Sequence, residues 1–204
     1  MSEKMPGPLR LHLIRHGETE WSLSGQHTGT TDIPLTPHGE GEARALAPWL
    51  ARIRFDHLLS SPRQRARRTC ALAGLGEPEI TPDLAEWDYG EYEGRRTPDI
   101  HKDNPGWVVY RDGCPGGESP DQVAARADRL IARLKAMQGN IALFSHGHFS
   151  CVLATRWIGL PVIEGQHLWL GTASLSILGH APSHPDVRVL ALWNATPAAL
   201  PAHA

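Results

Sequence analysis

The chain has 204 residues, a formal net charge of −2, and a composition that is 41% hydrophobic and 21% charged. This composition excludes a disordered, collagen-like or coiled-coil chain, and the near-neutral charge disfavours a general nucleic-acid binder. The length fits one domain over residues 1–204. The chain holds 12 His but only 3 Tyr and 3 Phe. Because histidine titrates near physiological pH and can act as nucleophile or metal ligand, we ask which histidines carry chemistry.

The cysteines and the N-terminal residues indicate where the protein resides. The cysteines are odd in number and far apart, so they predict neither a disulfide framework nor a cysteine-based zinc site. Residues 1–8 lack the apolar core of a signal peptide, and no run approaches the roughly 18 apolar residues of a membrane helix. We therefore expect a cytoplasmic protein with reduced thiols, no membrane partner and no nucleic-acid partner. The cysteines are Cys70, Cys114 and Cys151.

The first half of the chain alternates between strand and helix patterns. Residues 9–14 alternate apolar and polar side chains, which predicts a strand. Thr36 followed by a proline is typical of a helix N-terminus, and the apolar spacing continues that helix to about residue 53. Residues 55–60 predict a short buried strand, and residues 62–75 predict a second helix that ends at glycines.

The second half continues the alternation. Ser119 and the proline after it predict the start of a long amphipathic helix. A strand is predicted at 141–144, a helix at 148–158, and two late strands at 175–178 and 187–192. Together the elements favour a three-layer α/β/α sandwich with a mostly parallel central sheet.

Residues at about 86–118 interrupt this alternation. They are rich in Gly, Pro and Trp and show weak periodicity, so we interpret them as an irregular, lid-like excursion. Trp107 and Tyr110 within it are candidates to line the mouth of a substrate site. The Ala- and Pro-rich tail after Asn194 is expected to fray.

Two predicted strands end in similar tripeptides, Arg-His-Gly at 15–17 and Ser-His-Gly at 145–147. In open α/β sheets ligands bind beyond the carboxyl ends of the strands, so His16 and His146 meet there if the two strands are neighbours. The glycine after each histidine permits close approach of the backbone to a ligand.

Four blocks of sequence carry further motifs. They are Arg-His-Gly-Glu-Thr-Glu-Trp at 15–21 with Thr-Gly at 28–29 and Asp-Ile-Pro-Leu-Thr at 32–36, Ser-Pro-Arg-Gln-Arg-Ala-Arg-Arg-Thr at 61–69, Leu-Ala-Glu-Trp-Asp-Tyr-Gly-Glu-Tyr-Glu-Gly at 84–94, and Ser-His-Gly at 145–147. Taken in order, these blocks resemble the histidine phosphatase superfamily, and more narrowly its phosphoglycerate-mutase-like branch. Within that branch the chain is similar to small bacterial acid phosphatases and sugar-bisphosphatases.

The resemblance implies a role for each matching residue. His16 is expected to be the nucleophile that accepts the phosphoryl group, and Glu86 to protonate the leaving oxygen. The residues expected to grip the phosphate are Arg15, Arg65 and His146. Further positions that match phosphate or substrate contacts are Ser22, Thr28, Gly29, Tyr89 and Gly147; His27 and His148 are expected near the pocket. No metal and no cofactor is implied.

Elementary chemistry supports these roles. Phosphoryl transfer needs cations around three equatorial oxygens, and two arginines with a protonated histidine supply them without a metal. A neutral imidazole is a competent nucleophile. An alcohol is a poor leaving group, so a carboxylic acid is needed to protonate it.

The alternatives concern the reaction rather than the fold. The favoured hypothesis is a metal-independent phosphatase of small phosphomonoesters, sugar phosphates among them, working through phosphohistidine. A phosphoglycerate mutase and an inactive binding protein of the same fold remain open, as does the choice between monomer and homodimer. A metal site at the pair His146 and His148 is disfavoured because nearby arginines would repel a cation. Cys151 stands where bisphosphatase relatives tend to have arginine, which puts a second phosphate site in doubt.

Overall fold

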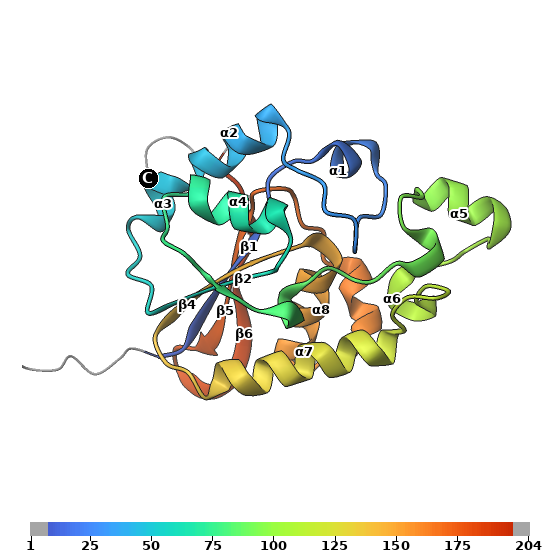
Figure 1. Cartoon of the computed structure of the whole chain (residues 1–204). Coiled ribbons are helices and arrows are strands. Elements are labelled where there is room, and N and C mark those ends of the chain that lie inside the picture. Colours follow the sequence, from blue (N-terminus) through green and yellow to red (C-terminus); the bar gives the residue numbers. More distant parts are fainter. Residues whose placement is uncertain (1–7, 198–204) are drawn as a thin grey trace, which may run out of the picture.

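The computed structural model describes residues 8–197, which form one six-stranded sheet with helices around it (Figure 1). The strands are β1 (Arg10–Arg15), β2 (His57–Ser60), β3 (Glu79–Ile80), β4 (Asn140–Ser145), β5 (Leu175–Ala181) and β6 (His184–Ala195). The α-helices are α1 (Glu20–Ser24), α2 (Pro37–Ala45), α3 (Ala47–Leu50), α4 (Gln64–Leu72), α5 (Thr97–Asp103), α6 (Val109–Asp112), α7 (Pro120–Lys135) and α8 (Gly147–Trp157). Three 3₁₀ turns are η1 (Pro82–Leu84), η2 (Gly90–Tyr92) and η3 (Val162–His167).

The sheet order is β3-β2-β4-β1-β5-β6. The first four strands in this order are mutually parallel, whereas β5 and β6 are antiparallel to their neighbours. In the pairing of β1 with β4, Arg15 lies opposite Ser145. The carboxyl ends of these two strands therefore coincide, and the predicted mostly parallel α/β sheet is confirmed.

Side chains on β1 and β4 point alternately to the two faces of the sheet. Leu11 and Leu13 join one apolar cluster, which includes the buried side chains of α7 and α8. Ile14 and Phe144 join a second cluster with side chains of α3 and α4. In Figure 1, α7 and α8 accordingly lie on the opposite side of the sheet from α2, α3 and α4. Burial on both faces explains why β4 is almost continuously apolar.

The prediction of one continuous helix from Pro37 to about residue 53 was wrong. The structure divides it at Leu46 into α2 and α3. Pro48 has no N–H to donate to the carbonyl four residues earlier, so one continuous helix cannot form there. The other predicted elements appear with ends shifted by a few residues, and the short elements α1, β3, η1 and η3 are additional.

The helix predicted after Ser119 is α7. Ser119 accepts a hydrogen bond from the backbone N–H of Gln122, and the Gln122 side chain accepts one from the backbone N–H of Ser119. This capping box fixes where the helix begins. Its buried residues follow helical spacing, which seats the helix on the sheet and on α8: Val123, Ala127, Leu130, Ile131 and Leu134.

The segment at 86–118 is more ordered than the predicted irregular excursion, because η2, α5 and α6 lie within it. Figure 1 shows α5 and α6 at one end of the molecule, beyond the main helices. The predicted fraying falls partly on residues 198–204, outside the described residues, and β6 continues to Ala195. Within residues 8–197, no helix is both long and apolar enough to span a membrane.

Candidate active site

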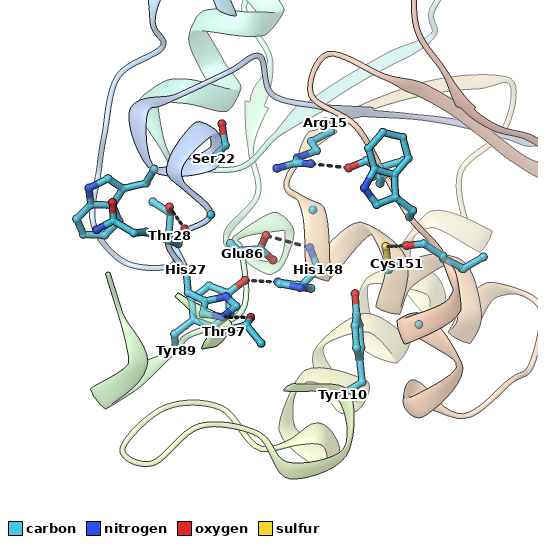
Figure 2. Close-up of a pocket in the computed structure, with 18 of the residues that line it drawn as sticks. Arg15, Ser22, His27, Thr28, Glu86, Tyr89, Thr97, Tyr110, His148 and Cys151 are labelled. Carbon is cyan, nitrogen blue, oxygen red and sulfur yellow. Dashed lines mark hydrogen bonds between the residues drawn. The ribbon is translucent and has the colours of Figure 1, made fainter. Parts of the chain in front are cut away.

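A cavity of about 400 Å³ opens beside the carboxyl ends of β1 and β4 (Figure 2). The segments after both strands, the 86–118 segment and residues 165–170 contribute to its wall. Of the predicted site residues, seven line it: Arg15, His16, Ser22, Thr28, Glu86, Tyr89 and Gly147. Three predicted residues, Gly29, Arg65 and His146, are not among the lining residues.

His16 lies at this cavity with one ring nitrogen held by the backbone. Its Nδ1 lies 2.7 Å from the carbonyl oxygen of Gly17. Because a carbonyl only accepts hydrogen bonds, Nδ1 carries the proton and Nε2 keeps its lone pair. Burial, together with the guanidinium groups of Arg65 and Arg15, holds the pKa of His16 well below its usual value. The imidazole is therefore neutral, as a nucleophile must be.

The loop that carries His16 is anchored from α4. The backbone N–H of Gly17 donates to Thr69 Oγ1 over 3.0 Å, and that hydroxyl donates to the carbonyl of Arg65. A side chain at Gly17 would collide with the carbonyl oxygen of Gly39 at 2.3 Å. The position after the histidine thus needs glycine because two backbone segments approach closely there.

Arg15 extends from the end of β1 along the cavity. One of its terminal nitrogens donates to the carbonyl of Leu170, while its buried Nε has no hydrogen-bond partner among the described residues. Gly147 lies against the guanidinium, where a Cβ would be 3.4 Å from Arg15 Nε. A buried N–H donor without a partner is costly, and an anion in the cavity would satisfy it.

Arg65 and His146 form a buried layer beside His16. The Nε of Arg65 donates to His146 Nδ1 over 3.2 Å, and His146 Nε2 lies 2.7 Å from Ser61 Oγ. The rings of His146 and His16 have centroids 5.1 Å apart. Remaining N–H groups of Arg65 donate to the carbonyls of residues 28, 29 and 31. These contacts fix the guanidinium beside the nucleophile without exposing it widely.

The expectation of a protonated His146 is not met in this structure. A nitrogen that accepts from Arg65 cannot itself carry a proton. Burial and the neighbouring charges, Arg65 first among them, also lower the pKa of His146 well below its usual value. The positive charge beside His16 therefore resides on the two arginines.

Glu86 is held by the start of α8. Its Oε1 accepts from the backbone N–H groups of Trp87 (2.9 Å) and Phe149 (2.7 Å), and its Oε2 accepts from that of His148 (3.0 Å). Only 9% of the residue is exposed. Three backbone bonds fix the carboxyl group at the cavity wall, where Figure 2 shows it close to His148.

Tyr89, His148 and His27 form a polar aromatic cluster behind Glu86. The Tyr89 hydroxyl is hydrogen-bonded to His148 Nδ1, and His27 Nε2 lies 3.2 Å from Thr97 Oγ1. Burial raises the pKa of Tyr89, so its hydroxyl donates. Burial also lowers the pKa of His27 and of His148 to about 4. Both imidazoles are uncharged at neutral pH.

The remaining predicted contacts have local roles in the structure. Ser22 closes a capping box with Thr19, and Thr28 donates to the carbonyl of Gln26. The backbone N–H of Gly29 donates to the carboxylate of Glu93, which stands behind the cavity wall. Ser22 and Thr28 line the cavity, so their place at the site agrees with the sequence interpretation.

The sequence did not predict a role for several residues of the site. Ser61 bonds His146 and Thr69 bonds Gly17, although both stand inside the matched block at 61–69. Trp169 and the residues around it line the cavity, but they lie in a stretch without periodicity or motif. Of the two aromatic candidates in the excursion, Tyr110 lines the cavity, whereas Trp107 is not a lining residue and is 3% exposed.

Comparison with known proteins assigns this constellation to a family. Residues 11–195 match the histidine phosphatase superfamily, branch 1. The chain belongs to the histidine phosphatase superfamily. This span includes all four blocks of sequence that resembled the family.

Individual members of the superfamily are similar over most of the chain. An acid phosphatase of Mycobacterium tuberculosis is 46% identical over 90% of this chain and 92% of its own length. Sedoheptulose 1,7-bisphosphatase of Saccharomyces cerevisiae is 36% identical over 75% of this chain and 69% of its own. The solved structure of an open reading frame product of M. tuberculosis superposes with a TM-score of 0.88, at 44% identity, over 93% of this chain and 98% of the other. The protein is thus a histidine phosphatase with the phosphoglycerate-mutase-like fold.

Proposed function

We propose that the protein hydrolyses small phosphomonoesters, sugar phosphates among them, through a phosphohistidine on His16. The observation that carries this proposal is the state of His16, whose Nδ1 is tied to the Gly17 carbonyl and whose Nε2 keeps its lone pair. Arg15 and Glu86 line the same cavity. The similarity to an acid phosphatase and to a sugar bisphosphatase supports the substrate class.

In the first half of the reaction, Nε2 of His16 forms a bond to phosphorus while the bond from phosphorus to the alcohol oxygen breaks. The guanidinium groups of Arg15 and Arg65 stabilise the negative charge on the phosphoryl oxygens, and His146 holds Arg65 in place. Glu86, in its protonated form, delivers a proton to the departing alcohol.

In the second half a water molecule attacks the phosphorus, and the phosphorus–nitrogen bond of His16 breaks. The Glu86 carboxylate takes a proton from that water, which regenerates the acid for the next cycle. Inorganic phosphate leaves, and the His16 imidazole returns neutral with its proton on Nδ1. No step requires a metal or a cofactor.

The direct test is to trap the phosphoenzyme. Quenching the protein in alkaline denaturant during turnover of a ³²P-labelled phosphomonoester is expected to leave label on the wild type that is stable in base and lost in acid, and none on His16→Ala. His57→Ala, which changes an exposed histidine at the start of β2, is the matched control and is expected to label normally. Label retained by His16→Ala would assign the nucleophile to another residue.

The same preparation separates the rival reactions. A mutase must hold a phosphorylated product for a second transfer, and Arg15 is the only arginine or lysine among the described cavity-lining residues. We therefore expect net phosphate release from phosphomonoesters without added metal. Exchange between 2- and 3-phosphoglycerate without phosphate release would establish a mutase. Absence of both reactions over a broad substrate panel would establish the inactive binding protein.

We infer that the protein works in the reducing cytoplasm. Its three cysteines are free and buried, and burial raises the pKa of each thiol to about 12. Because these thiols form no disulfide, the fold does not depend on an oxidising compartment, which supports a cytoplasmic location. Phosphatase activity in the cytosolic fraction of the source cells is the measurement that checks it.

A further inference from the structure

The cavity is larger than a phosphate group needs. At about 400 Å³ it falls in the range of pockets that enclose a whole small ligand. His16, Arg15 and Glu86 account for the phosphate and the leaving oxygen. The rest of the lining must therefore meet the alcohol part of the substrate, and its chemistry indicates which alcohols fit.

The part of the cavity that meets the alcohol carries no additional positive charge. Among the described lining residues, Arg15 is the only arginine or lysine, and it already faces the phosphate position. His27 and His148 are neutral because burial lowers the pKa of each to about 4. Cys151 donates to the carbonyl of Leu168 over 2.9 Å, and its thiol stays uncharged. A second phosphate placed here would lose water without gaining a cation.

The wall is instead aromatic and apolar on the side away from Ser22 and Thr28. Figure 2 shows Tyr110 and Cys151 together on that side, and Leu168 continues the wall. Tyr110 is buried, with its ring packed against Gly165 so closely that a Cβ there would lie 2.7 Å from a ring carbon. Such a wall accepts an uncharged group, and its polar atoms, those of the Tyr110 hydroxyl and of Gln166, which also lines the cavity, are uncharged as well.

Trp169 stands at the edge of this wall with 75% of its surface exposed. Its backbone carbonyl accepts from Trp193 Nε1 over 2.8 Å, and two residues later Gly171 N–H donates to Asn194 Oδ1 over 2.8 Å. Hydrogen bonds at residues 169 and 171 thus hold the backbone that carries the exposed indole. The residue between them, Leu170, binds Arg15, which faces the phosphate position. Tryptophan is enriched at binding interfaces, where one end of the side chain is buried and the other is in water.

We propose that Trp169, with the Tyr110 and Cys151 wall, forms a leaving-group subsite for an uncharged aromatic or apolar alcohol, and that a second phosphate is rejected there. The proposal rests on the phosphatase function proposed above and names its substrate class. Trp169 is the specificity-determining residue, because its indole can stack on an aromatic ring of the alcohol while Arg15 holds the phosphate.

The test uses three substrates with the same primary alkyl leaving oxygen, so that only the recognised group differs. They are ethyl phosphate, 2-phenylethyl phosphate and 1,2-ethanediol bisphosphate. We expect the phenyl ring to raise kcat/KM by about tenfold over ethyl phosphate, chiefly through KM, and the second phosphate to lower it. Trp169→Ala is expected to remove the phenyl advantage, lowering kcat/KM for 2-phenylethyl phosphate far more than for ethyl phosphate, whereas Trp169→Phe keeps most of that advantage.

Leu160→Ala, which shortens an exposed apolar side chain that is not a lining residue, is the matched control and should behave as the wild type. Equal turnover of ethyl and 2-phenylethyl phosphate, preference for the bisphosphate, or equal loss on both monophosphates in Trp169→Ala would overturn the proposal. Calorimetric titration with ethylphosphonate and 2-phenylethylphosphonate measures the same preference without turnover. If no ester is hydrolysed, the proposed function fails, and this titration still decides the subsite.

Discussion

At the scale of single residues, the chemistry of the site depends on which nitrogen or oxygen is already committed to a bond. The carbonyl oxygen of Gly17 accepts the proton of His16 Nδ1, and Arg65 Nε donates to His146 Nδ1. Burial keeps both histidines neutral by lowering their pKa, and the two arginines that would attract the phosphate, Arg15 and Arg65, add to this because a positive neighbour disfavours a second positive charge. Electrostatic attraction and nucleophilicity are therefore supplied by different side chains.

The proton-donor role of Glu86 is tested by its dependence on the leaving group. Glu86→Gln cannot donate a proton, so turnover of an alkyl phosphate is expected to fall by about 10²–10⁴. Turnover of p-nitrophenyl phosphate should fall far less, because nitrophenolate leaves without protonation. Steady-state rates on the two substrates measure this, with Glu91→Gln, an exposed neighbour, as control. An equal loss on both substrates would contradict the assignment.

At the scale of elements, two helices bring their ends or side chains to Glu86. The N-terminal N–H groups of α8 hold its carboxylate. From α7, Arg126 donates to the carbonyls of Ala85 (2.7 Å) and Glu86 (3.3 Å), pairs with Glu118, and lies over the Phe149 ring with its guanidinium carbon 4.2 Å from the centroid. We therefore expect Arg126 to be a positioning residue, which acts on the reaction through Glu86.

Arg126→Ala is expected to lower alkyl phosphate turnover more than p-nitrophenyl phosphate turnover, because a misplaced Glu86 donates its proton poorly. It should also lower the free energy of unfolding by about 1–3 kcal/mol, since buried acceptors lose their donor. Rates and urea unfolding measure the two effects. The control is Arg129→Ala on the same helix; Arg129 is exposed, pairs with Asp83, and should change stability by about 0.5 kcal/mol or less. If Arg126→Ala slows both substrates equally, its role is only structural.

At the scale of the whole molecule, folding places an unusual share of the histidines in surroundings that keep them neutral. Burial lowers the pKa of five of them, and these gather at or near the carboxyl ends of the central strands except for His12, which lies within β1. The five are His12, His16, His27, His146 and His148. Four of the twelve histidines in the chain, His16, His27, His146 and His148, thus belong to the buried site.

This arrangement predicts that acid destabilises the fold. Below about pH 6.5 the unfolded chain binds protons on these histidines, while folded His27 and His148 do not until about pH 4. The unfolded state then binds more protons, so the free energy of unfolding falls as pH drops from about 6.5 to 5, by at most about 1.4 kcal/mol per pH unit for each histidine.

Urea unfolding at pH 8, 7, 6 and 5 measures this dependence, in a window above the titration of ordinary carboxyl groups. His57→Ala, which removes an exposed histidine, should leave the slope unchanged. Stability that is flat or rises toward pH 5 would show that these histidines are protonated in the folded protein.

The sequence by itself determined the family and the α/β class, because the motifs and the strand and helix patterns are local in the sequence. The roles of the five principal site residues stay predictions. The blocks at 15–21 and 145–147 begin at the ends of predicted strands, and the parallel pairing of β1 with β4 then brings His16 and His146 to one edge. Helix ends were predictable where a cap was local, as at Ser119. The prediction of a single domain over residues 1–204 stays a prediction.

Only the tertiary structure decided the protonation of His146, the support of Glu86 by Arg126, and the neutral wall that ends at Trp169. Each of these depends on groups distant in sequence: Arg65 lies 81 residues from His146, and Arg126 lies 40 from Glu86. Burial and hydrogen-bond partners set the charge of a histidine, and no local pattern records which partners folding will supply. The composition showed many histidines; the packing determined that the ones at the site are uncharged.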